Sequence, residues 1–389
     1  MSKYFYHRNS LKYIVLLLLI STTTDANAQR KRVRDLGIDI GIFQTGKWNA
    51  ITDVSGVEVG HKTLIRSDHI RTGVTIIKPH SKDIFKNKVL GAVHVINGFG
   101  KSVGLTQIKE LGTIETPIAL TNTLNVFLVS DAVVEYMISN NPKIKSVNPV
   151  VGETNDSGLN DIQGRHVKKQ HVFSAIKNAK SGPVKEGSVG AGTGTRALGF
   201  KGGIGTSSRI LPNDLGAYTV GVLVQSNFGS SLKINGAPIG RELNKSAFSS
   251  KIPYDNDEGS CMIIVATDAP LSNRNLERMA KRAVIGMANV GSFISNGSGD
   301  YVIAFTTFEA LTLNKSIATR KEINNSAMNG IFLAVAEATE EAILNSLFMA
   351  ETIDSKYGTS EALPIDETLQ ILKKYNSLNW NKGLYPWKK

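Results

Sequence analysis

The chain has 389 residues, of which 41% are hydrophobic and 20% are charged, proportions that exclude an intrinsically disordered chain and are typical of a globular enzyme. The formal net charge is +12, but the basic residues are scattered, apart from a run of Arg30, Lys31, Arg32 and Arg34. No nucleic-acid-binding motif accompanies this run, so we expect a solvated basic surface and no nucleic-acid partner.

The first 28 residues have the layout of a secretory signal peptide. Lys3, Arg8 and Lys12 precede an apolar stretch at 13–20, and a polar stretch then ends in Ala-Asn-Ala at Ala28. The apolar stretch is too short for a membrane-spanning helix, which needs roughly 20 residues. We expect cleavage after Ala28, no stable membrane insertion and a periplasmic or secreted protein; an uncleaved anchor is the alternative.

Strand and helix patterns alternate along the rest of the chain and predict a mixed α/β fold. Short buried strands are expected at 74–77, 92–96, 219–224, 262–266 and 301–305. Helices are expected at 125–137, at 273–290 with Ser272 as its N-cap, and at 326–349, which is apolar on much of its circumference. The order of these elements does not by itself give the topology.

A glycine-rich stretch at 187–205 suggests a nucleotide-binding loop at first sight. It lacks the Gly-Lys-Ser/Thr ending of a phosphate-binding loop, and its glycine spacing fits a dinucleotide fingerprint only in part. We expect tightly packed backbone beside the active site and no cofactor. The seven histidines show no paired spacing, so no metal site is predicted, and His166 is expected at the surface.

The junction of Gly259 and Ser260 lies between a polar, weakly periodic segment at 241–258, expected to be a loop, and an apolar run at 261–266. Glycine lacks a Cβ, so its carbonyl is accessible from either face. Attack of the Ser260 hydroxyl on this carbonyl would shift the peptide to an ester, and water would then release a chain beginning at Ser260. Its α-amine, titrating near ~7.7–8.0, would serve as the base. A simple turn before a strand is the alternative.

Cys261, the single cysteine, follows the proposed nucleophile. Because neighbours on a strand point to opposite faces, Cys261 should point away from the side chain of Ser260. We expect a small buried apolar residue here, and a lone cysteine excludes an internal disulfide.

Five ordered segments resemble the P1 family of aminopeptidases, the DmpA group, which includes the L-aminopeptidase/D-esterases and the β-peptidyl aminopeptidases. They are VGETNDSGLND at 151–161, GSVGAGTG at 187–194 with GGIGTSSR at 202–209, VQSNFG at 224–229, GSCMIIVATDAPL at 259–271 and NGSGD at 296–300. The resemblance extends from about residue 36 to about residue 348.

The resemblance implies a four-layer αββα sandwich of the type shared with ornithine acetyltransferase and similar to N-terminal nucleophile hydrolases. Residues 29–389 would form a single catalytic domain, cleaved into 29–259 and 260–389, with both fragments contributing to one core. Members of the family form tetramers of such pairs, so a homo-oligomer is expected. The implied substrates are short peptides, amides or esters.

Ser298 and Asp300 are candidates for the proton relay. They stand two residues apart just before the strand at 301–305, so both side chains are expected on one face. Ser298 would relay a proton from Ser260, and Asp300 would orient Ser298; a turn is the alternative. The β-peptidyl members have Ser-x-Glu at these positions, whereas Asp300 is shorter by one methylene.

Asn227 is the candidate oxyanion donor, because it follows a buried strand and matches the family's asparagine; a turn is the alternative. Asn155 aligns with a position that is Tyr in some relatives, where the hydroxyl supports the oxyanion hole. An Asn amide also donates, but it is shorter. Glu153 and Asp156 are candidates for binding a substrate ammonium, with helix capping or solvent exposure as the alternative.

Together these features predict an exported, self-processing serine aminopeptidase that acts through an acyl-enzyme on Ser260. The main base is left open between the Ser260 α-amine and Ser298. An acyltransferase resembling ornithine acetyltransferase is one alternative, although those relatives use Thr at the cleavage point. A processed but non-catalytic periplasmic binding protein and an uncleaved structural domain are the others.

Overall fold

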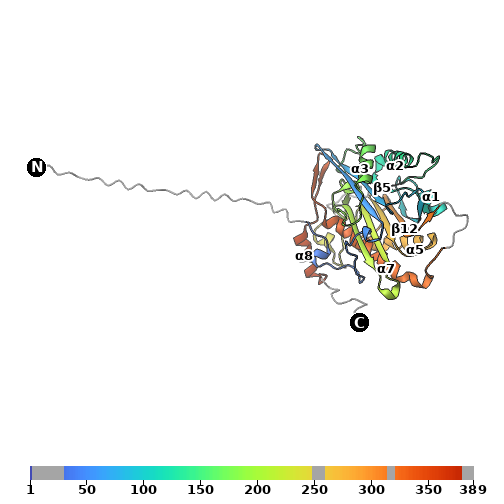
Figure 1. Cartoon of the computed structure of the whole chain (residues 1–389). Coiled ribbons are helices and arrows are strands. Elements are labelled where there is room, and N and C mark those ends of the chain that lie inside the picture. The colour runs from blue at the N-terminus through green and yellow to red at the C-terminus, as the bar shows by residue number, and fades with distance from the viewer. Residues whose placement is uncertain (2–29, 248–258, 313–319, 379–389) are drawn as a thin grey trace.

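The computed structural model describes Met1 and residues 30–247, 259–312 and 320–378 (Figure 1). The expected signal peptide, and residues 248–258 of the expected loop before Gly259, lie outside the described residues. Within the described ranges, no helix has the length and apolar character needed to cross a bilayer.

Six strands form the larger sheet, in the spatial order β4–β3–β12–β11–β10–β9. Strands β11 and β12 are parallel, and the other neighbouring pairs are antiparallel. The central strand β11 is buried along its whole length, as an apolar run predicts. The bounds are β3 Asn87–Gly98, β4 Thr113–Ile114, β9 Gly203–Ile210, β10 Thr219–Asn227, β11 Gly259–Thr267 and β12 Ser298–Thr312.

Four strands form the second sheet, in the order β1–β2–β5–β6, with β5 and β6 parallel. Its strands are β1 Glu58–Arg66, β2 Ile70–Lys78, β5 Ile118–Asn122 and β6 Val150–Thr154. Two small hairpins lie outside both sheets: β7 Arg196–Ala197 with β8 Phe200–Lys201, and β13 Ile353–Ser355 with β14 Gly358–Ser360.

Helices cover the outer faces of the two sheets, which gives the predicted four-layer αββα arrangement (Figure 1). Helix α7 packs on β9 and β10, α5 on β3 and β12, and α6 on α7, whereas α2 and α3 pack on the smaller sheet. These helices are α2 Val126–Asn140, α3 Lys169–Lys177, α5 Asn273–Ala280, α6 Ala283–Asn289 and α7 Met328–Phe348. The remaining helices are α1 Leu105–Leu111, α4 Ile239–Glu242 and α8 Ile365–Lys374.

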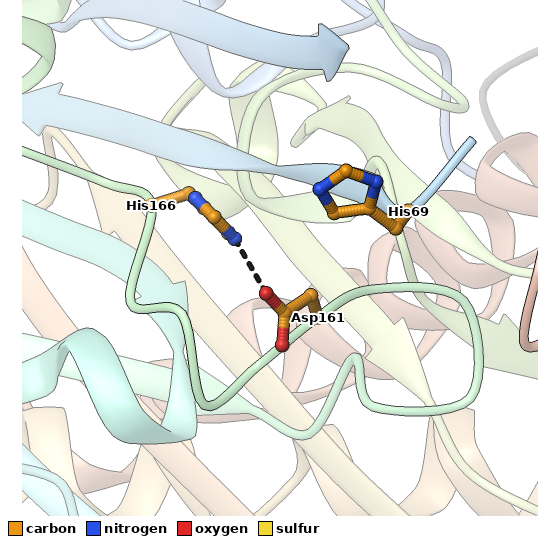
Figure 2. A group of neighbouring side chains, drawn as sticks. All are labelled: His69, Asp161 and His166. Carbon is orange, nitrogen blue, oxygen red and sulfur yellow. Dashed lines mark hydrogen bonds and ion pairs between the residues drawn. The ribbon is translucent and has the colours of Figure 1, made fainter. Parts of the chain in front are cut away.

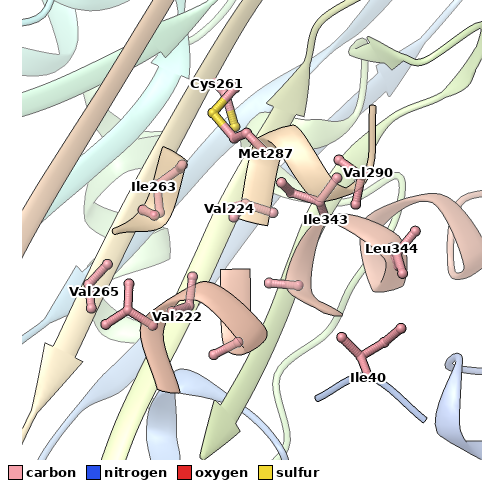
Figure 3. Close-up of a cluster of buried hydrophobic side chains, with 14 of the residues drawn as sticks. Ile40, Val222, Val224, Cys261, Ile263, Val265, Met287, Val290, Ile343 and Leu344 are labelled. Atoms are coloured by element: carbon pink, nitrogen blue, oxygen red, sulfur yellow. The ribbon is translucent and has the colours of Figure 1, made fainter. Parts of the chain in front are cut away.

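Alternate residues of β11 belong to two separate apolar cores. Cys261, Ile263 and Val265 face the layer of α5, α6 and α7 (Figure 3). Met262 and Ile264 face the smaller sheet. The prediction of a buried, apolar Cys261 is confirmed, and burial raises the pKa of its thiol well above the usual value.

The single helix predicted at 273–290 is wrong, because the segment forms two helices, α5 and α6, separated at Lys281 and Arg282. Ser272 does cap α5, by accepting a hydrogen bond from the Asn275 backbone N–H. The break lets α5 lie on the sheet while α6 lies against α7. The Arg282 guanidinium stacks over the Phe332 ring of α7 at 4.0 Å from its centroid, which holds this corner in place.

The basic run near residue 30 is solvated only in part: Lys31 is exposed, as a solvated basic surface predicts, whereas the three arginines are partly buried and hydrogen-bonded. Arg30 donates to the Leu363 carbonyl at 3.0 Å, and Arg32 forms an ion pair of 2.7 Å with Glu186. Arginine can bury its stem while the guanidinium reaches an acceptor, a property that composition alone does not reveal.

The third of these arginines, Arg34, joins a buried ion cluster on α7. Arg209 of β9 is fully buried and pairs with Glu337 at 3.0 Å and with Glu341 at 2.8 Å, and Arg34 pairs with Glu341 at 2.8 Å. Although burial by itself would raise it, the pKa of Glu341 is lowered to about 2 by Arg209 and Arg34. This cluster connects the N-terminal part of the chain to a helix that follows Ser260.

Candidate active site

The Gly259–Ser260 junction forms the start of the central strand β11. Ser260 is 4% exposed, and its Oγ donates a hydrogen bond of 2.5 Å to the Gly259 carbonyl oxygen. A Cβ at position 259 would lie 3.0 Å from the Ser298 Oγ and 3.3 Å from Phe228, so the space favours glycine. The hydroxyl therefore lies beside the carbonyl of the peptide bond that the sequence predicts to be cleaved.

Asn227, the last residue of β10, stands directly opposite Ser260 in the antiparallel register. Strand alternation places both side chains on the face of the larger sheet that packs on the smaller sheet, the face to which Met262 also belongs. The Asn227 Oδ1 accepts a hydrogen bond of 3.0 Å from the Arg196 backbone N–H, which fixes the amide with Nδ2 available as a donor. The structure thus brings a hydroxyl and an amide donor together at one end of the sheet.

Ser298 and Asp300 of β12 share one face, as their spacing predicts, and it is the face of Cys261 rather than that of the Ser260 side chain. In the parallel register Ser298 lies opposite Gly259, and Asp300 lies opposite Cys261. Ser298 therefore lies beside the peptide bond before Ser260, where a new α-amine would form. Among the described residues, neither the Ser298 hydroxyl nor either Asp300 carboxylate oxygen has a partner with full hydrogen-bond geometry.

Burial determines the charge state of Asp300. It is fully buried, and desolvation raises its pKa from 3.8 to about 6. The nearby Ser298 hydroxyl and the Cys261 backbone N–H oppose this shift without cancelling it. A buried carboxyl with a raised pKa and unsatisfied oxygens is typical of a functional site.

Glu153 and Asn155 lie at the same end of the molecule but have other partners. Thr154, between them, accepts a hydrogen bond of 2.8 Å from Gln225, two residues before Asn227. Glu153 accepts hydrogen bonds from the Lys101 backbone N–H at 3.0 Å and from the Thr123 hydroxyl. The Asn155 Oδ1 accepts from the Ser157 backbone N–H at 2.9 Å, a local turn.

The glycine-rich stretch at 187–205 is tightly packed backbone, as predicted. A Cβ at Gly202 would collide with the Ser226 carbonyl, and one at Gly205 would collide with the Ala342 carbonyl of α7. Substitution at either position would push the chain away from β10 or α7.

A buried lysine in this stretch, Lys201, was not singled out by the sequence analysis. Its ammonium donates to the Gly192 carbonyl at 2.9 Å and to the Gly202 carbonyl at 2.6 Å. Desolvation, with a smaller contribution from Arg196, lowers its pKa to about 7, although Asp156 opposes the shift. Lys201 pairs with Arg196 across the β7–β8 hairpin, so it supports the backbone that positions Asn227. Its position directly before two glycines, in Phe-Lys-Gly-Gly, was the available signal.

Asp156 is a buried aspartate like Asp300, but its carboxylate oxygens have hydrogen-bond partners. It accepts hydrogen bonds from Asn122 at 3.2 Å and from Asn160 at 3.0 Å. Burial nevertheless raises its pKa to about 6. These contacts tie Asp156 to the loop after β6, so it serves this loop rather than a substrate ammonium.

Comparison with known proteins gives a consistent result. The profile of peptidase family S58 matches residues 49–360. The β-peptidyl aminopeptidase BapA of Sphingosinicella microcystinivorans is 39% identical, over 95% of this chain and 98% of that protein.

Two solved structures are similar over nearly their full length. The β-aminopeptidase of a Burkholderia species is 41% identical, with a TM-score of 0.82 over 88% of this chain and 99% of that one. An L-aminopeptidase D-Ala-esterase/amidase of Ochrobactrum anthropi, a serine aminopeptidase with a variant of the Ntn hydrolase fold, is 34% identical. Its TM-score is 0.83 over 89% of this chain and 99% of that one.

Proposed function

The chain belongs to peptidase family S58 and is an aminopeptidase, and on this premise we propose that Ser260 is its nucleophile, generated by self-cleavage of the Gly259–Ser260 bond. The observation that carries the proposal is the Ser260 hydroxyl at the Gly259 carbonyl, on a central buried strand, with Asn227 opposite. The product fragments are residues 29–259 and 260–389.

Self-cleavage begins when Ser260 Oγ attacks the Gly259 carbonyl carbon and the C–N bond breaks, so that the amide becomes an ester and the nitrogen becomes an amine. Water then hydrolyses the ester, which leaves a carboxylate on Gly259 and a free α-amine on Ser260. The contacts across the cut, β10 with β11 and Arg209 with Glu337, hold the fragments together.

Turnover uses the same hydroxyl on a substrate carbonyl. The α-amine takes the Oγ proton, Oγ forms the acyl-enzyme, and the leaving amine is protonated before water releases the acyl group. Asn227 Nδ2 donates to the oxyanion, and Asn155 is the weaker candidate for a second donor. Ser298, beside the α-amine position, relays the proton, and Asp300 orients Ser298.

Glu153 is the group of the site region that we assign to the substrate's N-terminal ammonium. Its carboxylate is buried and held by two neutral donors, Lys101 N–H and Thr123 Oγ1, with no ion pair to a basic side chain among the described residues. An incoming ammonium would therefore compete with no basic side chain of the described residues for this carboxyl group.

We extend the proposal to substrates and location from the relatives and the N-terminus. The substrates are short peptides, amides or esters with a free amine, consistent with the β-peptidyl, L-aminopeptidase and D-Ala-esterase/amidase activities of the relatives. Residues 1–28 direct export, and the processed pairs assemble into a homo-oligomer.

The test compares matched peptides with a free or an acetylated N-terminus, and follows release of the first residue by mass spectrometry. We expect cleavage of the free peptide alone, with an acyl adduct on the 260–389 fragment. Ser260→Ala should abolish release, and Cys261→Ala, the matched control on the opposite face, should retain it. Activity that survives in Ser260→Ala and disappears in Cys261→Ala would assign the nucleophile to the thiol.

A further inference from the structure

Two histidines and an aspartate from distant parts of the chain meet next to the β1–β2 turn (Figure 2). His69 belongs to the turn, whereas Asp161 and His166 belong to the loop between β6 and α3. One donor atom from each residue lies within 4.8 Å of the other two. His166 Nε2 and Asp161 Oδ2 are 2.9 Å apart, and the two imidazole centroids are 6.1 Å apart. Within the described parts of the chain, no other such group of three is present.

These three side chains are a donor set for a first-row transition metal. Neutral imidazole nitrogens and a carboxylate oxygen are common ligands of Zn²⁺, and two histidines with one carboxylate leave open positions for water. Metal–ligand bonds of about 2.0–2.2 Å place neighbouring donors ~3.4 Å apart in a tetrahedral site. The side chains are 31%, 30% and 25% exposed for His69, Asp161 and His166, so each has room for the small shift required.

The surrounding residues already orient the donors. Asp68 Oδ1 lies 2.8 Å from His69 Nδ1, which leaves the Nε2 edge of His69 turned toward His166 and Asp161 (Figure 2). A carboxylate on the distal nitrogen of a metal-binding histidine is a recurrent outer-shell arrangement. The Asp161 backbone N–H donates to the His69 carbonyl at 2.8 Å, so the two segments are joined before any ion binds.

We propose that His69, Asp161 and His166 bind one divalent transition-metal ion of the Zn²⁺ class, with Asp68 orienting His69. The ion cross-links the β1–β2 turn to the loop that follows Glu153 and Asn155. Its role is to stabilise this loop. The ion would strengthen a connection that already exists, since Asn160 of the same loop accepts a hydrogen bond of 3.1 Å from the Arg71 backbone N–H at the start of β2. The proposal does not depend on Ser260 acting as the nucleophile.

The experiment uses the untagged, full-length protein after chelator treatment. Zn²⁺ is titrated by calorimetry, and Co²⁺ is titrated by its visible absorption, which reports nitrogen and oxygen ligands directly. We expect one ion per chain and a higher melting temperature with Zn²⁺. His69→Ala and His166→Ala should each weaken binding by ~100-fold or more, and Asp68→Asn by about 10–100-fold.

His94→Ala is the matched control, since His94 lies on β3 outside the cluster, and it should bind as the wild type does. His166→Gln, whose amide can still pair with Asp161, tests the metal ligand if His166→Ala fails to fold. Wild-type protein that shows no saturable Zn²⁺ binding at millimolar concentration would overturn the proposal. Undiminished binding in the His69→Ala/His166→Gln double variant would also overturn it.

Discussion

Two places on the helix-covered face of the larger sheet, one at β9 and one at the start of β12, hold buried charged groups in opposite conditions. In the α7 cluster, defined by Arg34, Arg209, Glu337 and Glu341, every carboxylate faces a guanidinium, and the pKa of Glu341 is lowered to about 2. At the start of β12, Asp300 has no ion pair among the described residues, and its pKa is raised to about 6. Burial is similar in both places, so the partners determine the sign of the shift. Buried charged groups that are paired hold segments of the fold together, whereas the buried acid without an ion pair lies at the candidate active site.

The largest expected effect separates function from stability. Ser260→Ala should lower kcat/KM for peptide hydrolysis by about 10⁴-fold or more, because the nucleophile is lost. Circular dichroism and the melting temperature should show a folded protein, since the Ser260 hydroxyl donates its hydrogen bond to the carbonyl of the adjacent Gly259 and not to a distant segment. A variant that is inactive because it is unfolded would remove the contrast between the two regions.

The α7 cluster should show the reverse behaviour. Arg209→Met leaves Glu337 and Glu341 without their buried partner and should lower the free energy of unfolding by about 3–5 kcal/mol. Denaturant unfolding measures this, and the fraction that remains folded should keep its kcat. Lys374→Met, which breaks the exposed pair with Glu242, is the control and should have no measurable effect on stability.

Asn227→Ala tests the amide opposite the nucleophile. Loss of an oxyanion donor should lower kcat by about 10²–10³-fold, with a smaller change in KM. Ser226→Ala is the matched control, because its hydroxyl faces the other way and pairs with Ser346 at 2.7 Å. Equal kcat losses in the two variants would indicate that strand β10, rather than the amide, is what matters.

The smallest effect is a change in the pH dependence of stability. Because the pKa of Asp300 is raised from 3.8 to about 6, the folded state holds this proton more tightly than the unfolded state does. The resulting stability is present below about pH 4 and is lost as the pH rises through about 6. Asp300→Asn lacks this titration, so its unfolding free energy should decline less between pH 4 and 6. Superimposable profiles for variant and wild type would contradict the assignment.

The sequence predicted the parts of the fold that depend on local patterns. The apolar run at 262–266 gave the core of β11, alternation placed Cys261 away from Ser260, and the long apolar helix became α7. The four layers came from the resemblance, whereas the candidate residues came from local residue chemistry and the resemblance together. The two-residue spacing correctly placed Ser298 and Asp300 on one face, but it did not give their relation to Ser260, which depends on the register between β11 and β12.

What the sequence missed depends on contacts between distant segments. Lys201 and the arginines near residue 30 look like surface charges until the acceptors that surround them are known. The break at Lys281 follows from two different packing partners for α5 and α6. His69 and His166 have no sequence spacing that pairs them, and only the docking of a loop on the β1–β2 turn brings them together.

Self-cleavage between Gly259 and Ser260 is the central claim, and intact mass of the purified protein beside its Ser260→Ala variant tests it most directly. We expect two wild-type fragments, the smaller beginning at Ser260, and an uncut variant. A single uncut wild-type chain would contradict the account and reduce Gly259–Ser260 to a turn at the start of β11.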